Sequence, residues 1–359
     1  MSDNNILTIC GWNVNSDRRV ELGYAKDVYP EYKYSERHSA IMKCIKTVSP
    51  DILCLTELSS QSWPLLKHDL VDLGYKLVHH NYCEDQHAFA MVLACRKNVK
   101  IITHCARYFN VHPDKPTIRP DDFQSLTDKS AYTSQNFVQE FERSTLLCEL
   151  EHSCKSFVIC IMHPALQQNY NVKSMEMLPG FIEEFIADRN LSATTPLIMA
   201  GDFNTINADI MAAVNNMVEV CQVSNLTFGA PYSTLDGKVS AAAAKSTFVF
   251  YPYDLGIDVM NDAELKKFIQ ELLSLTPTLG REFFNAVPRK MITGDWCLDY
   301  VFGRNVKGYN SRVLLAPTLP DKFNFDELDF ASYVEFCRNQ SIISFPSDHF
   351  AVVVNIELM

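Results

Sequence analysis

The sequence lacks the features that mark membrane, secreted and zinc-binding proteins. No apolar run approaches the roughly 18 residues that a spanning helix needs, and residues 1–5 contain no basic segment leading into an apolar stretch. The 12 cysteines include no Cys-x-x-Cys pair, which excludes the usual spacing of structural zinc sites. Most of them lie in apolar runs, where a free thiol packs as a small hydrophobic residue. We therefore expect a soluble intracellular protein in a reducing compartment, the cytoplasm in the simplest case.

The sequence also lacks an excess of basic residues. Its 32 lysines and arginines against 43 aspartates and glutamates give a net charge of −11 at pH 7. A chain of this charge does not attract a polyanion through its overall field, and a duplex-binding protein normally carries a basic surface. Any phosphate-bearing substrate must then be bound locally, by a metal ion or a small basic patch.

Linkers and repeats are missing as well. Apolar runs typical of strands alternate with amphipathic segments typical of helices, which predicts one layered α/β domain over residues 1–359. Strands are expected at residues 6–14, 51–58, 75–80, 88–96, 98–103, 144–151, 155–163, 196–201, 298–302, 312–315 and 350–356. Helices are expected at residues 35–48, 61–73, 173–189, 206–220 and 261–274, with Pro179 kinking or interrupting the third. Residues 108–142 are polar and without clear periodicity, which indicates a loop, lid or insertion.

Polar residues follow or end several of these apolar strands, the place where layered α/β enzymes hold their active sites. An Asp-x-Asn turn, a glutamate at a strand end or a Ser-Asp-His triplet each has an ordinary structural explanation when it stands alone. The set and its order along the chain are what indicate chemistry. Its members are Asn13 and Asn15, Glu57, His163, Asp202 with Asn204, Asp299, and Asp348 with His349.

The segments that contain these residues resemble the endonuclease/exonuclease/phosphatase superfamily of Mg²⁺-dependent phosphoesterases. They are residues 11–15 (Gly-Trp-Asn-Val-Asn), 50–57 (Pro-Asp-Ile-Leu-Cys-Leu-Thr-Glu), 161–163 (Ile-Met-His), 199–205 (Met-Ala-Gly-Asp-Phe-Asn-Thr), 296–302 (Trp-Cys-Leu-Asp-Tyr-Val-Phe) and 346–349 (Pro-Ser-Asp-His). The resemblance implies a deoxyribonuclease-like fold, in which a two-layer β-sandwich is flanked by helices. The active site of that fold lies at one end of both sheets.

The resemblance also implies a metal site. It assigns Glu57 as the carboxylate that binds the metal, Asn13 as a ligand or hydrogen-bond partner close by, and Asp348 as a further ligand. Mg²⁺ prefers hard oxygen ligands of this kind, and Mn²⁺ accepts the same ligands. By the same resemblance, Asn15 and Arg143 occupy positions that bind substrate.

The remaining residues of the set receive catalytic roles by the same resemblance. Asp202 positions or deprotonates the attacking water, and Asn204 donates to a phosphate oxygen. His349 contacts the phosphate or activates the water, with Asp299 orienting its imidazole ring. His163 supplies a second phosphate contact or a general acid.

The style of the motifs is closest to the deadenylase/nocturnin-like branch, which often shows Gly-Asp-Phe-Asn, Leu-Asp-Tyr and Ser-Asp-His. This similarity favours a nuclease or phosphodiesterase that acts on single-stranded nucleic acid or a nucleotide, through metal-assisted attack of water on phosphorus. Aromatic residues of 108–142 would then stack on bases; the candidates are Phe109, Phe123, Tyr132 and Phe137.

Two other functions are compatible with the sequence. The first alternative is an inositol phosphate or phosphoinositide phosphatase, because the inositol polyphosphate 5-phosphatases share Trp-Asn-Val-Asn and Asp-Trp-Cys. Against it, Thr205 and Ile206 stand here in place of their Tyr-Arg. A non-catalytic binding or scaffold protein on the same fold is the second alternative, because a fold does not guarantee activity. The complete set of site residues argues against this second alternative.

Overall fold

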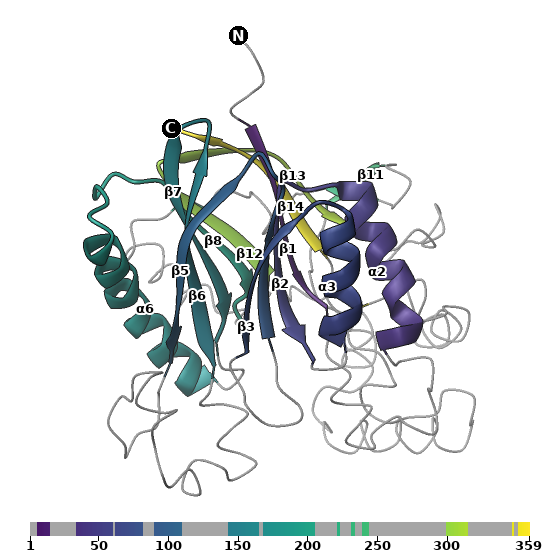
Figure 1. The fold of residues 1–359 in the computed structure, drawn as a ribbon, viewed down its shortest axis with the longest axis horizontal. Helices are drawn as coiled ribbons and strands as arrows, with labels where there is room; N and C mark the ends of the chain where they lie inside the picture. Colours follow the sequence, from purple (N-terminus) through teal and green to yellow (C-terminus); the bar gives the residue numbers. More distant parts are fainter. Residues whose placement is uncertain are drawn as a thin grey trace, which may run out of the picture.

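In the computed structural model, the chain folds into two β-sheets packed face to face, with helices on their outer faces (Figure 1). The structure describes residues 6–14, 34–59, 62–81, 90–109, 143–164, 168–204, 221–222, 231–233, 239–243, 299–314, 347 and 351–359. Within these residues, no helix is long and apolar enough to cross a membrane. The architecture is the helix-flanked two-layer β-sandwich that the resemblance implied.

The first sheet contains eight strands among the described residues, in the order β11-β10-β13-β14-β1-β2-β4-β3. In chain order, these strands are β1 (Ile6–Asn13), β2 (Ile52–Leu58), β3 (Lys76–Asn81), β4 (Ala90–Cys95), β10 (Pro231–Ser233), β11 (Val239–Ala243), β13 (Val306–Leu314) and β14 (Ala351–Leu358). Helices α2 (Tyr34–Val48) and α3 (Ser62–Asp72) cover its outer face (Figure 1).

The second sheet contains six described strands, in the order β5-β6-β7-β8-β12-β9. In chain order, they are β5 (Lys100–Tyr108), β6 (Ser144–His152), β7 (Lys155–His163), β8 (Leu197–Asp202), β9 (Cys221–Gln222) and β12 (Asp299–Arg304). Helix α6 (Gln168–Asp188) packs on the outer face of this sheet (Figure 1).

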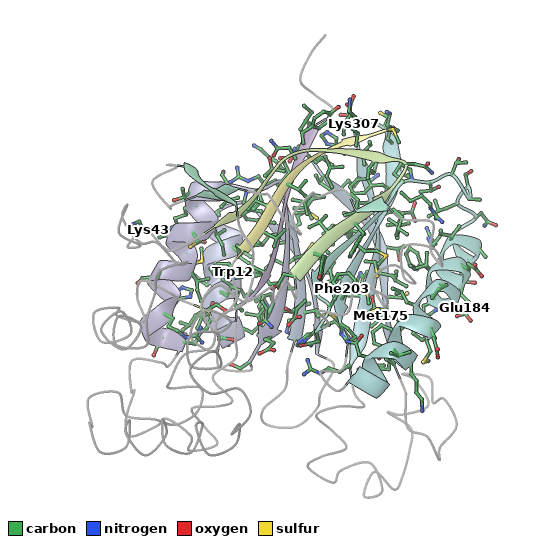
Figure 2. The ribbon with its side chains drawn as sticks, turned by 180° about the vertical axis from the view of Figure 1, so that it is seen from behind. Trp12, Lys43, Met175, Glu184, Phe203 and Lys307 are labelled. Carbon is green, nitrogen blue, oxygen red and sulfur yellow. The ribbon has the colours of Figure 1, made fainter. Side chains whose placement is uncertain are left out.

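Two hydrophobic clusters fix which way the central strands face. Under α2 and α3, the buried cluster includes Cys10 and Trp12 of β1. Under α6, it includes Met162 of β7 and Phe203, which follows β8 (Figure 2 labels Trp12 and Phe203). Successive strand residues point to opposite faces, so Asn13, which follows Trp12, and His163, which follows Met162, face the space between the two sheets.

In each sheet, one pair of parallel neighbours is connected by a described helix. β1 runs parallel to β2 with α2 between them in the chain, and β7 runs parallel to β8 with α6 between them. Parallel neighbours require a crossover of this kind, and both of their carboxyl ends lie at the same edge. The four strands end at Asn13, Leu58, His163 and Asp202, so the polar residues predicted at strand ends gather at one end of the sandwich.

Small residues let the two sheets approach each other just behind these strand ends. A Cβ placed on Gly11 would lie 3.6 Å from the amide nitrogen of Gly201 and 3.8 Å from the Cβ of Ala200, across the interface. Gly201 has a φ of 140°, and a Cβ there would press on the carbonyl oxygen of Met162 in the neighbouring strand. Asn13 lies two residues after Gly11 on β1, and Asp202 lies one residue after Gly201 on β8.

The expected strands and the first three expected helices are present, with differences at their ends. The helix expected at 173–189 begins earlier, at Gln168, and continues through Pro179 to Asp188, so the prediction of an interruption was wrong. Its buried stripe of Met175, Leu178, Ile182 and Phe185, spaced by three or four residues, packs on the sheet and holds the helix through the proline.

Several expectations fall outside the described residues. They are the helices at 206–220 and 261–274 and nearly all of the loop or lid at 108–142, which leaves the single-domain prediction for residues 1–359 untested. Among the described residues, eight cysteines are free, and six of these are buried, which agrees with their expected packing in apolar runs.

Gly201→Ala should destabilise the protein, because its methyl group meets Met162 in a backbone conformation that alanine rarely adopts. We expect a loss of roughly 2–4 kcal/mol in the free energy of unfolding, measured by chemical denaturation. Gly11→Ala is the matched control, since its new methyl group makes only ordinary contacts with Gly201 and Ala200. Equal stability of the two variants would contradict the close approach at Gly201.

Candidate active site

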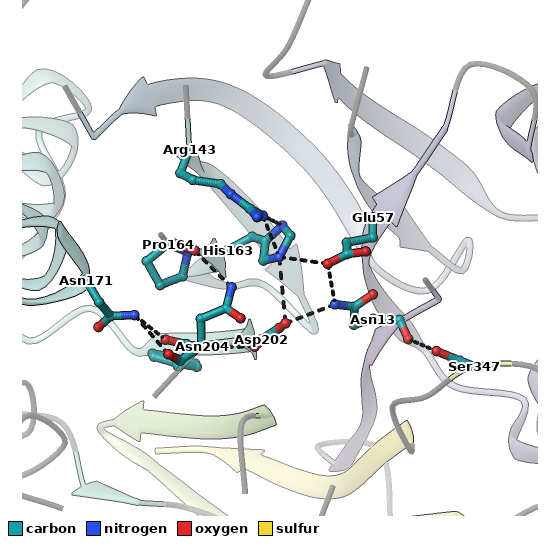
Figure 3. Close-up of polar contacts among 10 residues, drawn as sticks. Asn13, Glu57, Arg143, His163, Pro164, Asn171, Asp202, Asn204 and Ser347 are labelled. Carbon is teal, nitrogen blue, oxygen red and sulfur yellow. Dashed lines mark hydrogen bonds and ion pairs between the residues drawn. The ribbon is translucent and has the colours of Figure 1, made fainter. Parts of the chain in front are cut away.

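The amide of Asn13 joins carboxylates from the two sheets. Its Nδ2 atom donates to Oε1 of Glu57 at 3.0 Å and to Oδ2 of Asp202 at 2.9 Å (Figure 3). Asn13 and Asp202 are almost fully buried, whereas 19% of the Glu57 side chain is exposed. One neutral amide therefore holds two carboxylates in a buried place where their charges would otherwise repel.

A bulge in β2 turns Glu57 towards this amide. Leu55 and Leu58 both pack under the helices although they are three residues apart, and the register with β4 shifts between them. Glu57 has a φ of 58°, a left-handed conformation that is uncommon for residues other than glycine. The bulge adds one residue to the strand, so Thr56 and Glu57 follow each other before the apolar alternation resumes.

Asp202 is fixed through both of its carboxylate oxygens. While Oδ2 accepts from Asn13, Oδ1 accepts from the backbone N–H of Asn204 at 2.8 Å, which closes a turn just after β8. Asn204 has a φ of 49°, and its Nδ2 donates to the carbonyl of Pro164 at 2.9 Å. Asn171 of α6 donates to the carbonyl of Phe203 at 2.8 Å and supports the same turn (Figure 3).

His163 lies between a guanidinium and the two carboxylates. The Nη1 atom of Arg143 is 2.7 Å from both ring nitrogens, and on the other side Nε2 is 3.3 Å from Oε1 of Glu57 and 3.7 Å from Oδ2 of Asp202 (Figure 3). Guanidinium only donates, so at least one ring nitrogen must be unprotonated to accept from it. A neutral ring with its hydrogen on Nε2 satisfies both Arg143 and Glu57.

The pKa of His163 agrees with a neutral ring. Burial lowers this pKa, and the charge of Arg143 lowers it further, while Glu57 and Asp202 raise it; the net shift is downward from the ordinary value. His163 is 0% exposed. At neutral pH the ring is therefore a hydrogen-bond donor and acceptor rather than a cation.

Most of the predicted site residues that the structure describes are joined by these contacts. Asp299, the first residue of β12, is buried and paired with Asp202 of β8 in the antiparallel register, so their side chains point to the same face. Asn15, Asp348 and His349 lie outside the described residues.

Phe109, one of the candidates for base stacking, lies in the hydrophobic core. Phe109 is 0% exposed and belongs to the core under α6, where its ring lies 5.8 Å from that of Phe181. Phe123, Tyr132 and Phe137 lie outside the described residues. A role for Phe109 in stacking on substrate is therefore wrong.

Two residues that contact the site backbone were not predicted from the sequence. Ser347 donates from Oγ to the carbonyl of Asn13 at 2.7 Å, and Arg37 donates from Nη1 to the carbonyl of Val14 at 2.9 Å. A signal for Arg37 was present, because it lies four residues before Ile41 on the apolar face of α2. Ser347 belongs to the Ser-Asp-His segment, in which only the last two residues were assigned roles.

The arrangement has the donor set of a hard metal ion. Ligand atoms of Glu57, His163 and Asp202 all lie within 4.8 Å of one another. Two carboxylates suit Mg²⁺ or Mn²⁺, and a divalent cation would neutralise the charge that the Asn13 amide only screens. The residues present therefore match the group that the sequence implied.

Replacing each neighbour of His163 should move its pKa in a stated direction. Arg143→Gln removes a positive charge and should raise the pKa, whereas Glu57→Gln removes a negative charge and should lower it. An NMR titration of the histidine ring in metal-free protein measures both shifts, with His163→Gln to assign the signal. Shifts of the same sign in the two variants would contradict this electrostatic arrangement.

Comparisons with known proteins agree with the geometry. The profile of the Endonuclease/Exonuclease/phosphatase family matches residues 10–349. Uncharacterized protein L388 of Acanthamoeba polyphaga mimivirus is 25% identical over 221 residues, which cover 58% of this chain and 74% of that protein.

Two solved structures show the likeness of fold. The catalytic domain of human Nocturnin with a bound sulfate anion has 14% identity and a TM-score of 0.55, over 100% of this chain and 97% of that one. A mannosyl-6-phosphatase of Bacteroides thetaiotaomicron has 14% identity and a TM-score of 0.57, over 98% and 99%. Since the family profile spans nearly the whole chain, the protein belongs to the endonuclease/exonuclease/phosphatase family.

Proposed function

We propose that the protein is a metal-dependent phosphoester hydrolase, and that it cleaves a phosphodiester in single-stranded nucleic acid or a nucleotide. One observation carries the first part of this proposal. Glu57 from the first sheet and Asp202 from the second both accept hydrogen bonds from Nδ2 of Asn13, beside the buried His163. Membership of a family of phosphoester hydrolases supports the same reaction class.

Glu57 and Asn13 would hold the metal, together with Asp348 on the resemblance alone. When bound, Mg²⁺ or Mn²⁺ would polarise the scissile phosphate and stabilise charge on the leaving oxygen. Glu57 suits this role because its carboxylate is the partly exposed one of the pair.

Asp202 and its turn would act on the attacking water and the phosphate. The hydrogen bonds from Asn204 and Asn13 fix the Asp202 carboxylate, so Oδ2 can take a proton from water without reorienting. The amide of Asn204 gives one hydrogen to Pro164 and has a second for a phosphate oxygen.

A neutral His163 suits a phosphate contact better than the role of general acid. Its lowered pKa means that the ring lacks the second, acidic proton that a general acid gives up. The remaining N–H, on Nε2 beside Glu57, can donate a hydrogen bond to a phosphate that binds there. His349, oriented by Asp299, would then be the group that activates water or contacts the phosphate. Asn15 and Arg143 are kept as substrate-binding residues, with Arg143 acting beside His163.

Charge supports the choice of a single-stranded or small substrate. A net charge of −11 disfavours the extended phosphate backbone of a duplex. The deadenylase-like motifs support a nucleotide-containing substrate. A sugar phosphate or inositol phosphate is the second candidate, which the fold shared with a mannosyl-6-phosphatase favours.

A hydrolysis panel with Mg²⁺ tests the proposal. It contains single-stranded RNA including poly(A), single- and double-stranded DNA, NADP(H), and inositol phosphates with a sugar phosphate. We expect release of nucleotides from single-stranded substrate and a loss of at least about 100-fold in Glu57→Gln, because this change removes a metal carboxylate.

Glu151→Gln is the matched control, since Glu151 is a partly exposed glutamate of β6 that pairs with Lys100 at 3.8 Å. Phosphate release from inositol or sugar phosphates alone would replace the nuclease assignment by the second candidate. Equal rates for Glu57→Gln and Glu151→Gln would contradict the assigned site, and inactivity on every substrate would favour a non-catalytic binding protein.

A further inference from the structure

The backbone at the end of β1 is held by three hydrogen bonds from three different segments. The carbonyl of Asn13 accepts from Oγ of Ser347 at 2.7 Å, and the carbonyl of Val14 accepts from Nη1 of Arg37 at 2.9 Å. The amide of Val14 donates to the carbonyl of Thr56 at 3.1 Å. The Asn13 carbonyl is therefore tied to the C-terminal segment, the Val14 carbonyl to α2 and the Val14 amide to β2.

The bond to Thr56 relates the two sides of the site directly. Val14 follows Asn13, and Thr56 precedes Glu57, so this bond sets the distance between the amide donor and its first carboxylate. Asn13 must also reach Asp202 in the other sheet, at 2.9 Å. A rotation of the 13–14 backbone would break at least one of these two side-chain bonds.

Arg37 holds this backbone from an unusual place. It is 0% exposed, on the face of α2 that otherwise contributes Ile41 and Ile45 to the core, and its guanidinium lies 5.6 Å from the ring centroid of Tyr34. Removing a guanidinium from water is costly unless it is well paired, and an apolar side chain of similar volume would fill the space without that cost. Unlike an apolar side chain, the arginine donates a hydrogen bond to the carbonyl of Val14.

Ser347 holds the same backbone from the C-terminal side. It is 2% exposed and lies four residues before β14, which pairs with β1 along most of its length (Figure 3 shows Ser347 beside Asn13). The Ser347 hydroxyl gives its hydrogen to the carbonyl of Asn13, the residue whose side chain joins both carboxylates. The contact therefore lies in the buried site, at the backbone of Asn13, and not at the protein surface.

We propose that Ser347 and Arg37 are positioning residues, which fix the backbone of residues 13–14 so that the Asn13 amide reaches Glu57 and Asp202 together. This inference rests on the proposed function of that site. A displacement of about 1 Å in a catalytic group can reduce turnover by about 100-fold, so loss of either hydrogen bond should affect turnover more than substrate binding.

The test compares steady-state kinetics of Ser347→Ala, Ser347→Thr and Thr8→Val with those of the native protein, on the best substrate of the panel. Thr8 is the matched control because its hydroxyl donates to Asn355 at 3.0 Å, joining the same two strands away from the site. We expect Ser347→Ala to lower kcat by about 10- to 100-fold with KM changed by less than about threefold. Ser347→Thr should restore most of kcat, and Thr8→Val should leave it unchanged.

Arg37→Met provides an independent variant. It should lower kcat in the same way, because the Val14 carbonyl loses its donor. A denaturation midpoint that stays well above the assay temperature shows that unfolding does not cause the loss. A merely structural role would instead lower kcat only in proportion to the unfolded fraction.

A double mutant separates positioning of Asn13 from other effects. Adding Ser347→Ala to Asn13→Ala should lower kcat by less than about threefold further, because the group being positioned is already gone. An unchanged kcat in Ser347→Ala, or a full additional loss in the double mutant, would overturn the inference. If Glu57→Gln is inactive in the same experiment, the proposed function survives such a result; if Glu57→Gln is fully active, both fail.

Discussion

The candidate site depends on how closely the two sheets approach each other. Gly11 of β1 lies against Gly201 and Ala200 of β8, and the strand ends that follow carry Asn13 and Asp202. Because β1 and β2 are parallel in one sheet and β7 and β8 in the other, four carboxyl ends meet at one place. The chemistry is thus assembled by strand direction and small residues, from segments far apart in the sequence.

Electrostatics explains why these side chains remain together in a buried place. Two carboxylates would repel each other there, but the Asn13 amide donates to both, and a neutral His163 separates them from the charge of Arg143. Each group is held by a second contact that limits its freedom, such as the turn at Asn204. Such a preorganised set can act on a phosphate with little rearrangement during the reaction.

Most of the fold and the site's membership could be predicted from the sequence, because both depend on local patterns. Apolar runs marked the strands, and polar residues at their ends marked Glu57, His163 and Asp202. The bulge that turns Glu57 and the continuity of α6 through Pro179 could not be predicted from the sequence. Both depend on packing against partners that are distant in the sequence. The contact of Ser347 could not be predicted for the same reason, because its partner lies 334 residues away in the sequence.

The central claim is that Glu57 and its neighbours form a site for a hard divalent cation. Titration of Mn²⁺ into the protein, followed by electron paramagnetic resonance of the free ion, tests this claim without any substrate. We predict that the native protein and Glu151→Gln remove the free Mn²⁺ signal alike, while Glu57→Gln binds at least about tenfold more weakly. Identical binding by Glu57→Gln and the native protein would contradict the account.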